Sequence, residues 1–122
     1  MSADPFGDSL RRISERVPGT RLVMVIGIDG IPIERHGGDD TPNLEAVAAE
    51  YTTLFRSSAA GAKDVGLGEL RELTVRAERM TAVLVSITSE YFLFGVFEPG
   101  TFVGKARFAF LSASLDLQRE FQ

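Results

Sequence analysis

The feature that most constrains this fold is a short apolar run, Leu22 to Ile28, which is hydrophobic at nearly every position. Successive side chains of a strand point to opposite faces, so a strand of this kind needs cover on both sides. The run is short, is rich in β-branched residues, and is bounded by Gly19 and by Asp29–Gly30. It therefore predicts a central strand in a sheet that carries helices on both faces.

The other strand patterns place this run in a five-stranded sheet. Tyr91 to Phe97 is also bulky on both faces, whereas the strand from Ile31 to His36 contains Pro32, which only an edge strand tolerates. Two further strands are predicted at Glu69 to Ala77 and at Met80 to Thr88. The short connections, which include a predicted type I′ hairpin at Asp29–Gly30, imply antiparallel pairing. With strands numbered along the chain, the order 2-1-5-4-3 puts the two doubly apolar strands in the centre.

Three helices are predicted to cover the sheet, the first and last on one face and the middle one on the other. The first, Asp4 to Val17, begins with a capping residue followed by proline, and Thr41 repeats this start before the middle helix, Pro42 to about Ala62. The last spans about Phe102 to Arg119. The apolar stripes expected to face the sheet are Leu44, Val47, Ala48, Tyr51, Leu54 and Phe55 in the middle helix, and Val103, Ala106, Phe110, Ala113 and Leu117, widened by Phe108, Leu111 and Leu115, in the last.

Length and composition narrow the class of protein. The 122 residues fit a single α/β (α+β) domain, 1–122, with an ordered core expected at about 5–119. The absence of cysteine excludes a disulfide scaffold, a thiol nucleophile and sulfur-based zinc sites. The net charge of −4 comes from interspersed acidic and basic residues, without the basic stripe of a nucleic-acid-binding protein. No apolar stretch predicts membrane insertion and the first residues do not resemble a signal peptide, so we expect a cytoplasmic protein.

Two motifs that could bind ligands are explained more simply by structure. Gly66–Leu67–Gly68 follows a helix and opens a strand, whereas a phosphate loop follows a strand and opens a helix. His36 has no second histidine, and with Asp39 and Asp40 it would make at most a weak site for a hard cation. We favour a solvated loop there, and we expect no metal, no cofactor and no catalytic residue.

Arginines and aromatic residues allow two sharper hypotheses. Arg71, Arg76 and Arg79 could include an arginine finger for GTP hydrolysis, but an exposed strand face is the simpler interpretation. The C-terminal third is rich in aromatic residues, which could line a ligand cavity but are explained first by core packing. These residues are Tyr91, Phe92, Phe94, Phe97, Phe102, Phe108 and Phe110.

A second stripe on the middle helix carries the clearest functional signal. Its members are all small: Ala46, Ala49, Thr53, Ser57 and Ala60. A helix needs no such stripe to cover a sheet, whereas small residues let another helix approach closely. The alternative is that these are surface positions filled by good helix formers. We favour a dimer contact, flanked by the polar residues Glu45, Glu50 and Arg56.

Several segments together resemble the roadblock/dynein light chain family, in its bacterial or archaeal MglB-like branch. The segments are Val17–Pro18–Gly19–Thr20, Asp29–Gly30–Ile31–Pro32–Ile33, the stretch from Val65 to Leu73, and Phe97–Glu98–Pro99–Gly100 followed by Gly104 and Arg107. The resemblance extends from about Leu10 to Leu117. One departure is Glu98, because the family pattern has Asp before this proline.

The resemblance implies a three-layer, profilin-like roadblock fold and a homodimer. In such a dimer the middle helices pack together and the third strands join into one continuous sheet. The expected interface comprises Ala46, Ala49, Glu50, Thr53, Ser57, Ala60, Glu72, Thr74 and Arg76. The resemblance also implies a Ras-like small GTPase as partner, since MglB-type members act as GTPase-activating partners, but no residue here matches a known GTPase contact.

Three functions are therefore carried forward. The first is a non-enzymatic homodimeric regulator that binds a small GTPase and modulates its nucleotide cycle. The second is a structural adaptor subunit that tethers larger proteins without any nucleotide cycle. The third is a small-ligand sensor, which would need a buried cavity of several hundred Å³.

Overall fold

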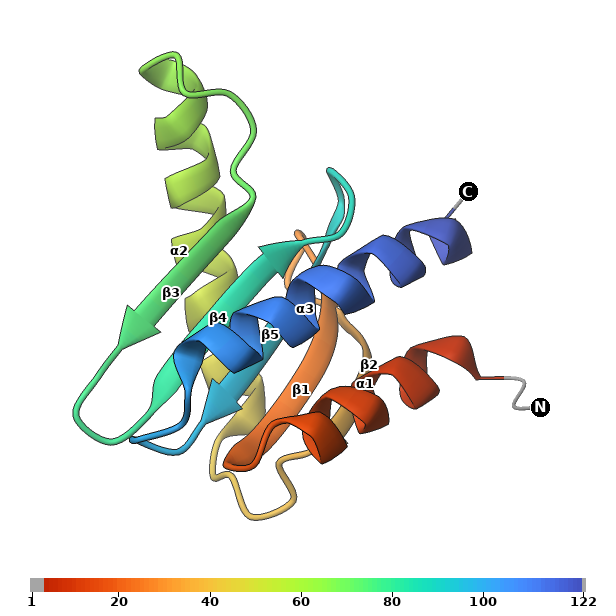
Figure 1. Ribbon diagram of the computed structural model, residues 1–122. Coiled ribbons are helices and arrows are strands. Elements are labelled where there is room, and N and C mark those ends of the chain that lie inside the picture. Colours follow the sequence, from red (N-terminus) through yellow and green to blue (C-terminus); the bar gives the residue numbers. More distant parts are fainter. Residues whose placement is uncertain (1–3, 122) are drawn as a thin grey trace.

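The computed structural model describes residues 4–121, which fold into a sheet sandwiched between helices (Figure 1). The helices are α1 (Pro5–Arg16), α2 (Leu44–Asp64) and α3 (Val103–Gln118), followed by a short 3-10 turn, η1 (Arg119–Phe121). The strands are β1 (Thr20–Gly27), β2 (Pro32–Gly37), β3 (Glu72–Arg76), β4 (Thr81–Ser86) and β5 (Tyr91–Phe97). The predicted three-layer architecture is confirmed, with α1 and α3 on one face and α2 on the other.

The sheet has the order β2-β1-β5-β4-β3, and every neighbouring pair is antiparallel. This is the predicted order, and it places the doubly apolar strands β1 and β5 in the centre. Leu22 to Ile26 of β1 and Phe92 to Phe94 of β5 are at most 2% exposed. Pro32 opens the edge strand β2, where a missing amide donor breaks no central ladder.

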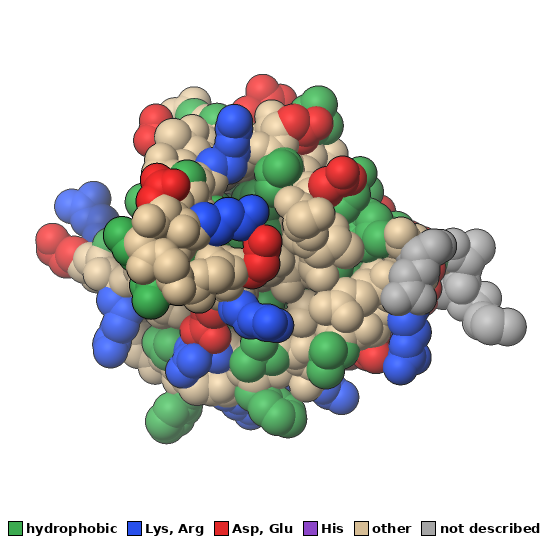
Figure 2. Space-filling view, turned by 90° about the horizontal axis from the view of Figure 1, so that it is seen from above, with side chains coloured by type: hydrophobic (Ala, Val, Ile, Leu, Met, Phe, Trp, Pro, Cys, Tyr) green, Lys and Arg blue, Asp and Glu red, His purple; other side chains and the backbone are tan. Residues whose placement is uncertain are grey.

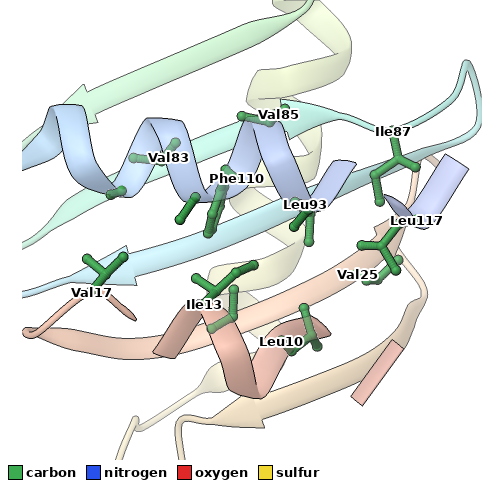
Figure 3. Close-up of a cluster of buried hydrophobic side chains, with 14 of the residues drawn as sticks. Leu10, Ile13, Val17, Val25, Val83, Val85, Ile87, Leu93, Phe110 and Leu117 are labelled. Carbon is green, nitrogen blue, oxygen red and sulfur yellow. The ribbon is translucent and has the colours of Figure 1, made fainter. Parts of the chain in front are cut away.

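One core layer lies between the sheet and the pair α1 and α3. Leu10 and Ile13 of α1 and Phe110 of α3 point toward the sheet, where they meet strand residues such as Val25 and Leu93 (Figure 3). The helical capping prediction for α1 is confirmed, because the Asp4 carboxylate accepts a hydrogen bond from the Gly7 amide at 3.0 Å. This face of the sheet is closed by two adjacent helices.

The other core layer lies under α2 alone. The Phe55 ring stacks on the Phe92 ring with centroids 4.5 Å apart, and the Tyr51 ring lies 5.3 Å from the Phe94 ring. Ala48 is 1% exposed, so α2 approaches the sheet closely at this turn. One helix therefore covers the face of the sheet that carries these rings.

The loop between β1 and β2 differs from the prediction. A type I′ turn needs positive φ at both central residues, but only Gly30 has it (φ 89°) and Asp29 does not. The loop spans Ile28 to Ile31, and the Gly30 amide donates to the Gly27 carbonyl at 2.8 Å. The Asp29 carboxylate instead accepts from the Ile31 amide at 3.0 Å, which is the local hydrogen bond that favours Asp in turns.

The start of α2 was also predicted wrongly. The helix begins at Leu44, and its N-cap is Asn43, not Thr41. Asn43 has a left-handed backbone (φ 55°), so it stands outside the helix, and its carbonyl accepts the first helical hydrogen bond from the Val47 amide at 3.0 Å. The strands β3 and β4 are shorter than predicted, because the segments before Glu72 and after Ser86 form loops.

Gly95 on β5 lets two aromatic rings approach the strand. A Cβ atom at this position would overlap the ring of Phe110 and press on that of Phe97. We expect Gly95→Ala to lower the free energy of unfolding by about 1–3 kcal/mol through overpacking, as measured by chemical denaturation. Gly104→Ala is the matched control, because a Cβ there meets no atom within 4 Å and alanine favours a helix by about 1 kcal/mol. Equal stability of the two variants would contradict this packing.

Candidate interaction surface

The small-residue stripe of α2 forms an exposed ridge. The inward side of the helix is marked by Ala48, Thr52 and Phe55, all buried, and the Thr52 hydroxyl donates to the Ala48 carbonyl at 2.7 Å. The ridge lies on the opposite side, and all its members are exposed: Ala46, Ala49, Thr53, Ser57 and Ala60. The Thr53 hydroxyl donates to the Ala49 carbonyl at 3.1 Å, so the helix itself satisfies this polar group. The structure thus brings the predicted stripe together on one surface.

Leu54 extends this surface toward β3, which corrects the prediction that it belongs to the core. Its exposed fraction is 40%. Thr52 points toward the β1–β2 loop, since its Cγ2 lies 4.0 Å from the Cβ that a side chain on Gly30 would have. At 100° per residue, Leu54 therefore projects from the opposite flank of α2, on the side of β3. There Leu73 and Val75 of β3 are only half-buried, so an apolar strip continues from the helix to the edge of the sheet.

The strand β3 is an edge that is open to pairing. Within residues 4–121 it pairs with β4 alone, in a regular register from Glu72 opposite Val85 to Arg76 opposite Thr81. Edge strands are commonly protected by proline, by a bulge or by charged side chains. β3 has no proline and no bulge, and its two charged residues, Glu72 and Arg76, stand at its ends. Its outer backbone groups are therefore available to a further strand.

The face of β3 that lies toward α3 is polar. Glu72 and Thr74 are half-buried there and Arg76 is exposed, as the strand alternation requires. The Arg107 guanidinium donates to both carboxylate oxygens of Glu72, one of them at 3.1 Å. This hydrogen bond and the negative charge of Glu72 raise the pKa of Arg107 above its ordinary value. The ion pair ties the edge strand to α3.

Comparisons with known proteins identify the family. The sequence profile of the Roadblock/LC7 domain matches residues 8–97. The chain belongs to the Roadblock/LC7 domain family. No curated protein sequence matches this roadblock domain significantly. The predicted family is therefore confirmed by the sequence itself, over most of the chain.

Solved structures confirm the roadblock fold. Myxococcus xanthus MglB superposes with a TM-score of 0.88 at 16% identity, covering 99% of this chain and 98% of that one. A Roadblock/LC7 domain from Streptomyces avermitilis gives a TM-score of 0.85 at 15% identity, with coverages of 95% and 97%. Profilin II from Acanthamoeba castellanii gives 0.59 at 20% identity, with coverages of 99% and 100%, as expected for a profilin-like fold.

The acidic residues considered for a cation site lie apart from this surface. Asp40 forms an ion pair with Arg21 at 3.3 Å and Asp39 one with Arg35 at 3.3 Å, so cations of the chain already neutralise both carboxylates. Residues 4–121 contain no group of three His, Asp or Glu side chains arranged to hold a metal. The unusual Glu98 also pairs with Arg21, at 3.3 Å.

The arginines proposed as alternatives are exposed, and acidic and basic side chains are interspersed over the face seen in Figure 2. These arginines are Arg71, Arg76 and Arg79.

A groove of about 730 Å³ lies beside the C-terminal half of α2, between Arg56, Lys63 and the loop residue Thr88. It is open to solvent, unlike the buried cavity expected of a ligand sensor. None of the helices formed by residues 4–121 is long and apolar enough to span a membrane.

The aromatic and aliphatic residues of α3 divide between the core and the surface. Phe110 is fully buried, but Phe102 and Phe108 are 83% and 69% exposed. Leu111 and Leu115 are also exposed, at 42% and 62%. The prediction that Phe108, Leu111 and Leu115 widen the core stripe is therefore wrong, because α3 packs on the sheet through the opposite side.

The orientation of α2 can be tested with two neighbouring residues. We expect Phe55→Ala to cost about 3–5 kcal/mol of folding free energy, because the ring is 5% exposed and stacks on Phe92. We expect Leu54→Ala to cost under about 1 kcal/mol, because its side chain already contacts solvent. Thermal denaturation at low protein concentration measures both. Equal losses would mean that Leu54 belongs to the core after all.

Proposed function

We propose that this roadblock domain is a homodimeric adaptor that binds a Ras-like small GTPase and modulates its nucleotide cycle. The observation that carries the proposal is the exposed ridge of small residues on α2, and the unpaired outer edge of β3 supports it. No catalytic group of its own is needed for this role. In line with the resemblance, we also propose a bacterial or archaeal, cytoplasmic protein.

In the proposed dimer, two copies meet across a twofold axis at α2 and β3. Small residues on the ridge let the two α2 helices approach closely, and the apolar strip at Leu54, Leu73 and Val75 leaves solvent. The two β3 strands satisfy each other's outer backbone groups, which extends the sheet through both copies. The proposed interface residues are Ala46, Ala49, Glu50, Thr53, Ser57, Ala60, Glu72, Thr74 and Arg76.

The GTPase part of the proposal is supported by the family and by the fold shared with MglB. A partner that binds the GTP form of a GTPase more tightly than the GDP form shifts the population of its switch loops. Faster hydrolysis would require, in addition, that the adaptor positions the catalytic groups of the GTPase itself. The regulator therefore acts through differential affinity.

The dimer can be split by charge on the ridge. We expect Ala49→Arg combined with Thr53→Arg to halve the molar mass measured by light scattering, because four guanidinium groups would meet across the twofold axis. The control is Glu15→Arg, on the exposed side of α1, where the side chain is 67% exposed. A double variant whose molar mass equals that of the wild type at the same concentration would rule out this interface.

The nucleotide dependence can be tested by co-purification. We expect Ras-like GTPases from the native organism to be captured more strongly when loaded with a GTP analogue than with GDP, by at least about fivefold if the coupling resembles typical allosteric values. The split double variant should lose this capture if the paired body forms the docking surface. Capture that does not depend on the nucleotide would favour the structural adaptor instead.

A further inference from the structure

The outer side of α3 carries a row of large apolar residues that this fold leaves bare. Phe108, Leu111 and Leu115 are 69%, 42% and 62% exposed. At 100° per residue they fall within a sector of about 60°, opposite to the buried side of the helix. A helix that is apolar on both sides is normally buried on both sides. In Figure 1 the helix lies across the front of the sheet, so its outer side is free of the rest of the chain.

A groove adjoins the C-terminal part of this row. It has a volume of about 350 Å³ and lies between α3, the segment before β3 and the end of β4. Leu111 and Leu115 form one wall, and Leu70, Val85 and Ile87 contribute most of the remaining apolar lining. The surface therefore offers both protruding apolar side chains and a hollow of the size that could receive one of them.

We propose that this row binds the same row of a second copy, with the two α3 helices antiparallel about a twofold axis near Leu111. Phe108 and Leu115 lie about one helical turn on either side of Leu111. The antiparallel arrangement therefore sets Phe108 of each copy against Leu115 of the second copy, at the mouth of the groove. Leu111 meets its own equivalent at the axis. Such a contact is isologous, because the same patch serves both copies.

The charges beside the row fit this arrangement. Lys105 and Asp116 lie on the same flank of α3, since their separation is close to three full turns. Neither forms an ion pair with any residue of the chain between 4 and 121. Both are about one and a half turns from Leu111, on opposite sides of it, so each Lys105 faces Asp116 of the second copy. On the other flank, the charge of Arg107 is already neutralised by Glu72.

This self-complementarity selects a second copy as the occupant. A second copy offers an acidic and a basic group at the two matching positions, which an anionic membrane surface does not. The α3 contact uses residues other than those of the proposed regulatory dimer, although its groove borders the segment that precedes β3, so the two contacts can be tested with separate variants. If both contacts form, the protein assembles beyond two chains.

Charge reversal tests the register of the contact. We expect Lys105→Asp and Asp116→Lys each to raise the dissociation constant of the α3 contact by about tenfold, because each variant turns two symmetric attractions into repulsions. The combined variant Lys105→Asp with Asp116→Lys should restore the affinity. Leu115→Glu should abolish the contact without unfolding the chain, since its side chain is largely exposed. Sedimentation velocity over a concentration series measures assembly, and circular dichroism checks folding.

The same experiment in the Ala49→Arg, Thr53→Arg background separates the two interfaces. There the α3 contact alone should give a species of two chains, and adding Leu115→Glu should give single chains. Three results would each overturn the α3 contact. The first is assembly that the α3 variants leave unchanged, and the second is a combined charge reversal that fails to restore assembly. The third is a wild type that never exceeds two chains at high concentration. Failure of the regulatory dimer would instead leave the mass unaffected by the α2 variants.

Discussion

The structure depends on the complete burial of its two central strands. Both faces of β1 and β5 are apolar, so each face of the sheet must be covered by helices. Five strands at the usual spacing are about 20 Å across, whereas one helix covers about 10 Å. On the side of α1 and α3 two helices share this task, but α2 works alone. The partial exposure of Leu54, Leu73 and Val75 follows from that imbalance, because α2 covers the centre of the sheet and leaves the flank next to β3 open.

The same reasoning explains how much could be predicted from the sequence. Runs such as Leu22 to Ile28, apolar on both faces, determine which strands are central, and Pro32 marks an edge, so the strand order followed from elementary rules. The small-residue ridge of α2 was also visible at helical spacing. Leu54 was assigned wrongly because it lies at the border of the apolar stripe, where only the position of the helix over the sheet decides exposure. The left-handed Asn43 was missed because the Thr–Pro pair before it resembles a helix start.

The helix α3 shows what the spacing of apolar residues in a sequence cannot decide. Its inner residues, such as Phe110, and its outer residues, such as Phe108 and Leu115, are both apolar and both recur at helical spacing. A pattern of this kind identifies the helix but cannot state which side packs on the sheet, so both sides were assigned to the core. The better inference from two apolar sides is two contacts. That inference needs no knowledge of the fold. It treats each apolar side of α3 as a possible sheet contact and leaves the other side for a second contact.

The two uncovered surfaces differ in their physical character, which bears on how each can bind. The α2 ridge offers small side chains, so a partner gains from close backbone approach and from strand pairing at β3 more than from buried side-chain area. The α3 row offers large side chains and a groove, so a partner gains mainly from apolar burial. The ion pair between Glu72 and Arg107 connects β3, which borders the first surface, to α3, which carries the second. Exposed ion pairs add little to stability, so the position of α3 is set mainly by its buried side, such as Phe110, and this pair adds a polar contact between the two surfaces.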